Sequence, residues 1–302
     1  MTNILITGGS GLIGRRLTEI LLERGYLVSH LGRTKGNGSV KSFIWDIDKQ
    51  LVESGSLEGI DVIVHLAGAG IADAPWTMKR KREILESRTN ATRLLYKELK
   101  KDKRTIKAFI AASAIGYYGF GTQDEIFTEE TKPGNDFLAT VTQRWEEEVD
   151  TIESLGIRVV KIRTGIVLSE RGGALEEIAR PVKYYVGAPL GTGNQYVSWI
   201  HIDDLCGIYC KAIADLSMSG AYNGVSPTPI TNREFTKAIA STLHRPLLLP
   251  HIPGFVLKLI LGEMANLVLQ GSKISADKIS SAGYTFKYID IRSALSDLLE
   301  KE

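Results

Sequence analysis

Short apolar runs and stretches of helical periodicity alternate along the first half of the chain. Apolar runs predict buried strands at residues 3–6, 26–31, 43–46, 61–68 and 106–112, the fourth of which runs into a turn of small residues. Helical spacing of apolar residues marks the segments 12–24 and 77–100. Strands separated by helices indicate an α/β protein whose Rossmann-type, doubly wound parallel sheet carries helices on both faces.

The second half of the chain follows a strand at 158–162 and has a different composition. Residues 172–194 combine a helical stretch with a loop rich in turn formers, which is typical of a substrate lid. Helical patterns follow near 203–216, 231–243, 254–270 and 290–300. We therefore expect a Rossmann domain at 1–168 that also receives roughly 196–218, and a smaller C-terminal α+β substrate lobe formed mainly by 169–302. The apolar stretch 252–269 is expected to face the core of this lobe, with a dimer surface as the alternative.

Composition excludes several classes of partner. The 302 residues carry a formal net charge of +2, so neither nucleic acid nor an anionic membrane is expected to bind. The most apolar stretch, Leu247 to Leu269, is interrupted by prolines and charged residues and is too broken to span a bilayer. Low cysteine use and the lack of a basic and apolar leader favour a cytoplasmic protein.

The two cysteines, Cys206 and Cys210, lie four residues apart in a helical segment. They are expected to be buried apolar residues on one helix face. Together with His201 they match no zinc-binding spacing, so no metal site is expected.

A glycine-rich turn joins the first strand to the first helix. In Gly8-Gly9-Ser10-Gly11-Leu12-Ile13-Gly14, Gly8 would form the tight turn and Gly11 would let a pyrophosphate approach the backbone. Gly14 would let the helix pack closely on the strand, with phosphates at the helix N-terminus. The pattern favours dinucleotide binding; a tight turn without a ligand is the alternative.

The end of the second strand indicates which dinucleotide binds. An NAD-selective site places a carboxylate about 20 residues after the glycines, where it accepts hydrogen bonds from the ribose 2′-OH. Here that position holds Arg33, nineteen residues after Gly14, and an arginine suits a 2′-phosphate instead. A solvated loop arginine is the alternative. We expect NADP(H) as the cofactor, with Asp46 placed to meet the adenine amino group.

The carboxyl ends of the predicted strands bring the candidate residues together. Gly8, Arg33, Gly68 and Ser113 all follow strands, and ligands of doubly wound sheets bind at this edge. The small turn Leu66-Ala67-Gly68 would let the cofactor's central ribose and phosphates come close. His65, directly before that turn, is expected to be a core histidine.

Motifs at these strand ends resemble those of the extended short-chain dehydrogenase/reductases, a group that includes the nucleotide-sugar epimerases. The motifs are the glycine turn above, His65-Leu66-Ala67-Gly68, Ser113-Ala114-Ile115-Gly116-Tyr117-Tyr118-Gly119, Arg163-Thr164-Gly165-Ile166-Val167-Leu168 and Trp199-Ile200-His201-Ile202-Asp203-Asp204-Leu205. More narrowly, the chain resembles the YfcH-like branch of the epimerase family (39U-like) in Asp136-Phe137-Leu138-Ala139-Thr140-Val141, Trp145-Glu146, residues 187–193 and Leu261-Gly262-Glu263-Met264-Ala265. The resemblance covers essentially the whole chain and implies an NADP(H)-dependent oxidoreductase or epimerase.

One part of the family's catalytic pattern is missing. In the family a serine holds the substrate oxygen, and a tyrosine with a lysine four residues later transfers its proton. Ser113 matches the serine, but the tyrosine and lysine positions hold Leu138 and Thr142. Tyr96 and Lys100 have the right spacing but precede Ser113, on a surface expected to be solvated.

Tyr117 and Tyr118 are therefore the candidate substitute acids, with a packing role at the pocket wall as the alternative. Arg163 and Thr164 are expected to border the nicotinamide side of the cofactor. His201 and Asp203 are expected to shape the pocket structurally.

These residues support hydride transfer on a small polar or nucleotide-sugar-like metabolite whose identity stays open. The alternative is a non-catalytic NADPH-binding protein that senses redox state, because the tyrosine and lysine are missing. Cofactor-independent isomerisation is the weaker third hypothesis, since it leaves the glycine turn unexplained. The sequence is compatible with a monomer or a homodimer.

Overall fold

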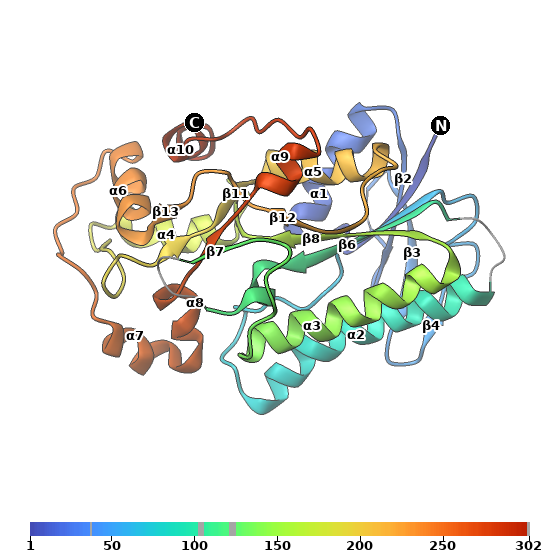
Figure 1. Cartoon of the computed structure of the whole chain (residues 1–302), viewed down its shortest axis with the longest axis horizontal. Helices are drawn as coiled ribbons and strands as arrows, with labels where there is room; N and C mark the ends of the chain where they lie inside the picture. The colour runs from blue at the N-terminus through green and yellow to red at the C-terminus, as the bar shows by residue number, and fades with distance from the viewer. Residues whose placement is uncertain (37, 102–105, 121–124, 301–302) are drawn as a thin grey trace.

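A parallel sheet forms the centre of the molecule (Figure 1). The computed structural model describes residues 1–36, 38–101, 106–120 and 125–300, and in these ranges the sheet has eight strands. All neighbouring strands pair in parallel except β3 with β4, which pair antiparallel. Their order across the sheet is β12 (Gly220–Gly224), β8 (Arg158–Thr164), β6 (Ala108–Ala114), β5 (Val62–His65), β1 (Asn3–Thr7), β2 (Leu27–Gly32), β3 (Lys41–Asp46) and β4 (Leu51–Val52).

Helices cover both faces of this sheet because alternate side chains of its strands are apolar. Ile4 and Ile6 of β1 pack in one core with α1 (Leu12–Glu23) and α5 (Ile202–Ala214). Leu5, between them, packs in a second core with α2 (Met78–Lys101) and α3 (Phe137–Asp150). Strands buried on both faces and covered by helices are the mark of a doubly wound sheet. The predicted Rossmann-type α/β fold is confirmed.

A smaller lobe has a third apolar core of its own, around Leu175, Trp199, Phe235 and Leu295. Its helices are α4 (Ala174–Lys183), α6 (Asn232–Thr242), α7 (Gly254–Leu261), α8 (Asn266–Leu269), α9 (Asp277–Ser281) and α10 (Ile291–Leu299). Three two-stranded sheets pair β10 (Tyr196–Val197) with β13 (Ile230–Thr231), β11 (Trp199–His201) with β9 (Ile166–Leu168) and β14 (Lys273–Ile274) with β7 (Ile126–Phe127). Short 3₁₀ turns occupy Ile115–Tyr118, Thr151–Leu155 and Gly262–Ala265.

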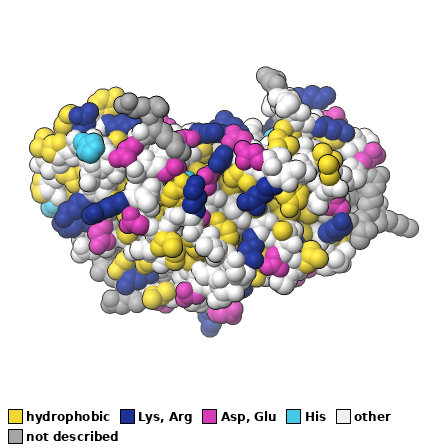
Figure 2. All heavy atoms as spheres, turned by 90° about the horizontal axis from the view of Figure 1, so that it is seen from above, with side chains coloured by type: hydrophobic (Ala, Val, Ile, Leu, Met, Phe, Trp, Pro, Cys, Tyr) yellow, Lys and Arg dark blue, Asp and Glu magenta, His cyan; other side chains and the backbone are white. Residues whose placement is uncertain are grey.

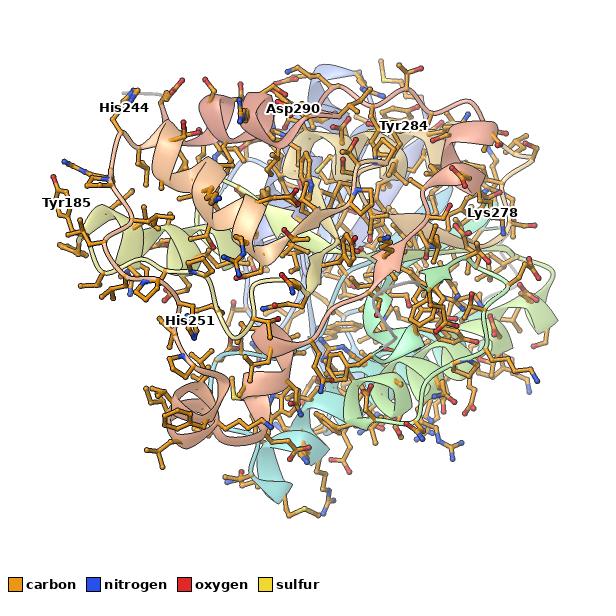
Figure 3. The ribbon with its side chains drawn as sticks, turned by 60° about the vertical axis from the view of Figure 1, so that its left-hand side comes forward. Tyr185, His244, His251, Lys278, Tyr284 and Asp290 are labelled. Carbon is orange, nitrogen blue, oxygen red and sulfur yellow. The ribbon has the colours of Figure 1, made fainter. Side chains whose placement is uncertain are left out.

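The C-terminal lobe is attached to the sheet layers by partly buried polar contacts. The hydroxyl of Tyr284 donates to Asp204 Oδ1 on α5 at 2.9 Å, and Lys278 Nζ donates to the carbonyl of Ala221 in β12 at 2.8 Å (Figure 3). The carboxylate of Asp204 also accepts hydrogen bonds from the backbone amides of Lys287 and Tyr288. The contacts with Asp204 hold residues 284–288 against α5.

The structure differs from the sequence-based expectation in the region 252–269. The helical pattern at 254–270 is divided into α7, a 3₁₀ turn and α8 because Gly262 adopts a left-handed φ of 58°. The expectation that this stretch faces the core is wrong, since Phe255, Leu259 and Ile260 are 73%, 86% and 71% exposed. Within the described part of the chain, no helix is both long and apolar enough to cross a bilayer.

Candidate functional site

The glycine turn between β1 and α1 is too tight for larger side chains. Gly8 adopts φ +71°, and a Cβ added to Gly14 would lie 2.4 Å from the carbonyl oxygen of Gly8. The first helix therefore begins directly against the turn. Gly11 is its N-cap residue and provides no side-chain hydrogen bond, and Leu12 and Ile13 form its first turn. Uncapped N–H groups at a helix start, with the helix dipole behind them, favour a bound phosphate.

The turn after β5 lies against the glycine turn. A Cβ on Gly8 would lie 3.0 Å from the backbone of both Leu66 and Ala67. The Ala67 amide donates to Thr7 Oγ1, which is also 2.7 Å from Nδ1 of His65. His65 is fully buried, and burial lowers its pKa to about 3, so it is neutral. It is a core histidine, as expected, and it fixes these two turns side by side.

The residues expected to contact the adenosine end lie at the ends of two neighbouring strands. Arg33 follows the last residue of β2, is exposed, and makes no ion pair with any described residue. Asp46 ends β3, where the backbone amide of Lys49 donates to its Oδ1 and lowers the carboxyl pKa. The ionised carboxylate of Asp46 and the guanidinium of Arg33 therefore lie at the carboxyl ends of the neighbouring strands β3 and β2. Ser10, in the glycine turn, is exposed.

Ser113 belongs to a buried charged network at the carboxyl end of β6. Its hydroxyl donates to Glu146 Oε1 of α3 at 2.6 Å. The same carboxylate accepts two hydrogen bonds of 2.8 Å from Nε and Nη2 of Arg163, the sixth residue of β8. The Arg163 and Glu146 side chains are only 5% and 6% exposed. With its proton directed at Glu146, Ser113 presents only lone pairs to a ligand.

The two candidate tyrosines have different surroundings. Tyr118 is buried; its hydroxyl donates to Asn223 Oδ1 at 2.6 Å and accepts from Arg163 Nη1 at 3.1 Å. Burial raises the pKa of Tyr118 to about 12. Tyr117 is half-buried, and its ring centroid lies 3.5 Å from Arg163 Cζ. No described residue forms a hydrogen bond with the Tyr117 hydroxyl. Of the two phenols, Tyr117 is therefore the one whose hydroxyl no described residue engages.

The face of α3 next to this site carries neither a tyrosine nor a lysine. A Cβ added to Gly116 would lie 3.3 Å from Leu138 Cβ and 3.6 Å from Thr142 Oγ1, so both residues lie close to Gly116, which directly precedes Tyr117. Thr142 is buried, and its hydroxyl donates to the carbonyl of Leu138. These are the two positions that the resemblance described above assigns to the family's proton-transferring pair.

The segment after β9 reaches the start of α1. A Cβ added to Gly173 would lie 3.0 Å from Leu12 Cδ2, and Arg171 forms an ion pair with Glu19 of α1. The beginning of the expected lid therefore borders the candidate phosphate site. Thr164, whose hydroxyl donates to the carbonyl of Ile162, ends β8 at the same edge of the sheet.

Several other residues considered in the sequence make contacts within the protein. Cys206 and Cys210 are buried free thiols, as expected, and burial raises both thiol pKa values. The His201 ring is stacked on Tyr288 with centroids 3.8 Å apart, and Asp203 pairs with Arg16 of α1 at 2.7 Å. In the described ranges, no group of three or more histidine, cysteine or acidic side chains is arranged to hold a metal ion.

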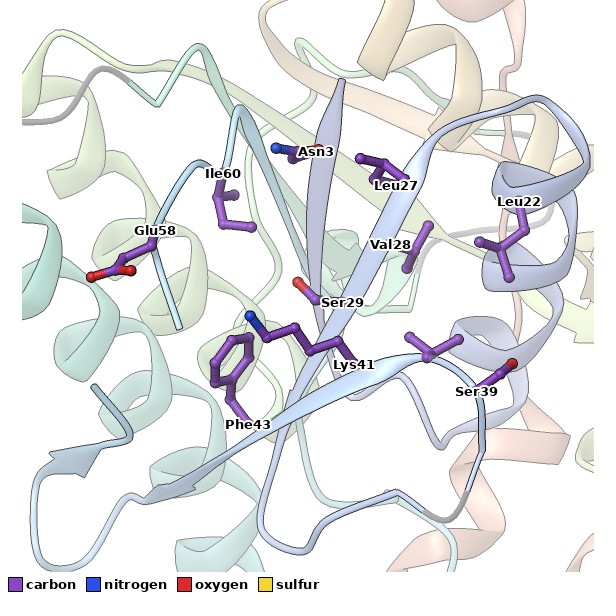
Figure 4. Close-up of a pocket in the computed structure, with 11 residues that line it drawn as sticks. Asn3, Leu22, Leu27, Val28, Ser29, Ser39, Lys41, Phe43, Glu58 and Ile60 are labelled. Carbon is purple, nitrogen blue, oxygen red and sulfur yellow. The ribbon is translucent and has the colours of Figure 1, made fainter. Parts of the chain in front are cut away.

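An open hollow lies at the opposite edge of the sheet from these residues (Figure 4). Asn3, Leu27 and Lys41, the first residues of β1, β2 and β3, line it together with Leu22 and Phe43. Ligands of doubly wound sheets bind at the carboxyl ends, so this hollow is not the candidate site. Acidic and basic side chains are interspersed on the face shown in Figure 2, which forms no extended surface of one charge.

The chain is similar to known proteins over its full length. Residues 4–223 match the NAD dependent epimerase/dehydratase family, and residues 252–298 match a domain of unknown function, DUF1731. Epimerase family protein YfhF of Bacillus subtilis is 37% identical, covering 98% of this chain and 98% of YfhF. The structure of human epimerase family protein SDR39U1 with NADPH covers 100% of both chains at 30% identity, with a TM-score of 0.90.

A nucleoside-diphosphate sugar epimerase structure from Corynebacterium glutamicum is 34% identical, with a TM-score of 0.80, over 99% of this chain and 58% of that chain. The resemblance to extended short-chain dehydrogenase/reductases of the epimerase family is confirmed, and so is a nicotinamide dinucleotide as the cofactor of the family. The chain belongs to the NAD dependent epimerase/dehydratase family.

Proposed function

We propose that the protein binds NADP(H) at the start of α1 and transfers hydride to or from a carbonyl or carbinol carbon of a small polar or nucleotide-sugar-like metabolite. The observation that carries the proposal is the Gly8–Gly14 turn, whose helix start has no capping side chain and whose Gly14 has no space for a Cβ. A pyrophosphate satisfies such N–H groups. The NADPH-bound human relative supports the same cofactor.

The preference for NADP(H) over NAD(H) rests on Arg33. A 2′-phosphate beyond β2 would meet an exposed guanidinium, and no carboxylate between Gly25 and Arg33 is present to accept the ribose 2′-OH of NAD. In the proposed division of the chain, residues 1–168 with roughly 196–218 hold the cofactor, and the remaining residues from 169 onward cover the substrate. Arg171 and Gly173 would then close over the phosphates.

The chain's own residues supply orientation and proton transfer. Bound nicotinamide supplies the hydride acceptor or donor. Ser113, whose own proton is held by Glu146, accepts a hydrogen bond from a neighbouring hydroxyl of the polar substrate and so orients it. In carbonyl reduction Tyr117, whose ring centroid lies 3.5 Å from Arg163 Cζ, donates its phenolic proton to the substrate oxygen as hydride reaches the carbon, and a Tyr117 phenolate remains. In the reverse direction this phenolate takes the proton of the carbinol hydroxyl as hydride leaves its carbon.

The first experiment tests the cofactor. Calorimetric titration is expected to show tighter binding of NADPH than of NADH, and Arg33→Ala is expected to reduce this preference at least tenfold, since one charge-assisted contact to a phosphate is lost. Lys35→Ala is the matched control, an exposed cation two residues along the same loop. Failure of the wild-type protein to bind NADPH would contradict the proposal as a whole.

The second experiment tests catalysis. NADPH carrying deuterium at C4 is mixed with a panel of carbonyl compounds, and deuterium in the product alcohol reports hydride transfer. Tyr117→Phe is expected to lower the rate about 10²-fold or more, as removal of a proton-transfer group does. Ser113→Ala is also expected to lower the rate, because a contact that orients the substrate is lost. Tyr118→Phe, which changes a buried hydroxyl of the same residue type, is expected to have a much smaller effect.

A second candidate function is a non-catalytic NADPH-binding protein that reports redox state to a partner. The observation that favours it is the absence of a tyrosine and lysine on the described α3, where Leu138 and Thr142 pack instead. This candidate requires that Ser113→Ala leave NADPH affinity unchanged and that no carbonyl compound receive deuterium. Transfer to any compound of the panel, lost in Ser113→Ala, excludes it.

A further inference from the structure

Helix α7 is apolar around its circumference but is covered on one side only. Lys258 is its one charged residue, and nearly all of its other residues are large and apolar. Leu257 is buried, whereas Phe255, Leu259 and Ile260 are largely exposed. A helix that is apolar all round is normally buried, so the outer face of α7 has no covering element within the described structure.

Both ends of α7 are attached to the rest of the molecule. Before the helix, the amide of Ile252 donates to the carbonyl of Pro189 at 2.9 Å, and the carbonyl of Ile252 accepts from the amide of Gly191 at 2.8 Å. After the helix, Glu263 forms an ion pair with Lys81 of α2. The helix itself lies at the periphery of the smaller lobe (Figure 1). The exposed face is therefore held in place, and ordering it in an interface costs little conformational entropy.

The exposed apolar area of α7 is close to what one partner of a stable dimer contributes. At ~150 Å² for a fully exposed side chain of this size, the exposed fractions of four apolar residues of α7 correspond to about 400 Å². These residues are Phe255, Leu259, Ile260 and Leu261, the last of them 37% exposed. One side of a standard interface buries about 800 Å², of which a little over half is apolar. A contiguous patch of this size on a protein surface marks an interaction site.

The composition of this face favours a second copy of the chain as its partner. Helices that bind membrane surfaces carry several lysines or arginines on their polar side, whereas α7 has Lys258 alone and is followed by Glu263. A strongly charged protein partner would likewise meet no matching charge there. Homodimer interfaces, in contrast, are more apolar than the remaining surface and are depleted of charge at their centre.

The spacing of the exposed residues suits contact between two identical helices. Phe255 and Leu259 are four residues apart and form one ridge along α7. Ridges of this kind interdigitate when two helices cross at about −50°. We propose that the exposed face of α7 is the core of a two-fold symmetric dimer interface between two copies of this chain. Phe255 of each copy packs beside Leu259 of the partner subunit, and the long stem of Lys258 brings its ammonium to the rim.

Sedimentation velocity of the full chain between about 0.1 and 100 µM tests the proposal, since interfaces of this size dissociate at micromolar concentrations or below. The wild-type protein is expected to be a dimer at the upper end of this range. The double variant Phe255→Ser with Leu259→Ser is expected to dissociate at least tenfold more readily, because two central apolar anchors are lost. The matched control is Leu51→Ser with Leu216→Ser, two leucines outside α7 that are 60% and 74% exposed.

Cross-linking tests the contact itself. The single variants Phe255→Cys and Leu259→Cys are mixed under mild oxidation, and the native cysteines do not interfere because Cys206 and Cys210 are buried. A disulfide between the two substituted positions is expected to form at least tenfold faster than one between molecules of Leu51→Cys, which carries an equally exposed thiol elsewhere. Circular dichroism establishes that each variant is folded, so that a change in association is not a loss of structure.

The proposal is overturned if the wild-type protein stays monomeric throughout the concentration range. It is also overturned if the double variant in α7 dimerises as the wild type and the control do, because a different face would then form the dimer. Binding of a monomeric wild-type protein to vesicles of phosphatidylcholine with phosphatidylglycerol, lost in the α7 double variant, would assign the face to a membrane instead. None of these outcomes depends on NADPH, so the proposed function stands or fails separately.

Discussion

The ion pair between Glu146 and Arg163 makes a strong prediction about stability. Glu146→Ala removes a carboxylate that accepts two hydrogen bonds of 2.8 Å from Arg163 and one of 2.6 Å from Ser113. Both charged side chains are almost fully buried, so water cannot replace the lost partner. Breaking a buried pair by removing one member costs about 3–5 kcal/mol, because the remaining charge is left unpaired. We expect the free energy of unfolding to fall by this amount.

The double variant Glu146→Leu with Arg163→Met distinguishes the net stabilisation by the ion pair from the cost of leaving the Arg163 charge buried without a partner. It removes both charges and leaves only neutral groups without partners. The Tyr118 hydroxyl still donates to Asn223, so Ser113 is the main group that loses an acceptor. One unsatisfied hydroxyl costs about 1–3 kcal/mol. The double variant is therefore expected to be more stable than Glu146→Ala, despite carrying one substitution more.

Urea unfolding followed by circular dichroism measures both effects, with midpoints compared at a common slope. Glu147→Ala is the matched control: Glu147 is the next residue of α3, and its pair with Arg144 is exposed, at 59% and 64%. An exposed pair of this kind contributes about 0–1 kcal/mol. The reasoning is refuted if Glu146→Ala is within 1 kcal/mol of Glu147→Ala, or if the double variant is less stable than Glu146→Ala.

Three further predictions follow from other buried contacts. The pKa of His65 is about 3 in the folded protein against about 6.5 when unfolded, so its contribution to stability is complete above pH 6.5 and is lost as pH falls toward 3. Between pH 7 and pH 5, the free energy of unfolding of His65→Gln, measured with urea, should therefore fall by about 2 kcal/mol less than that of the wild-type protein. Gly14→Ala places a Cβ 2.4 Å from a carbonyl oxygen and should weaken NADPH binding more than tenfold by calorimetry, whereas Gly254→Ala, with its nearest contact at 3.5 Å, should not. Asp204→Ala removes the acceptor for Tyr284 and for two backbone amides, and should increase hydrogen exchange at residues 284–288 while exchange in β1 stays unchanged.

The layers of the fold could be predicted because each strand and helix carries its own periodic signal. The alternation at Ile4, Leu5 and Ile6 already assigns side chains to two cores, and the first helix and strand fall within a residue or two of the expected bounds. The three two-stranded sheets could not be predicted, because strands of two or three residues are too short to show a period. A glycine such as Gly262 can end a helix, and this is a local property. Whether the apolar side chains of residues 252–269 are covered depends instead on contacts with residues distant in the sequence.

The candidate site was partly predictable for the same reason. The glycine turn is contiguous, so its conformation is local. The partners of Ser113 and Arg163 are separated from them in sequence by 33 and 17 residues, and no local pattern indicates that they meet at Glu146.

The location of uncompensated charge bears on the choice between catalysis and sensing. Hydride transfer to a carbonyl generates negative charge on oxygen, which needs a proton donor or a cation close by. Arg163, which shares Glu146 with Ser113, is already compensated by that carboxylate. Carbonyl reduction at this site therefore requires Tyr117 to supply the proton, and without that donor the protein would bind NADPH but not turn over.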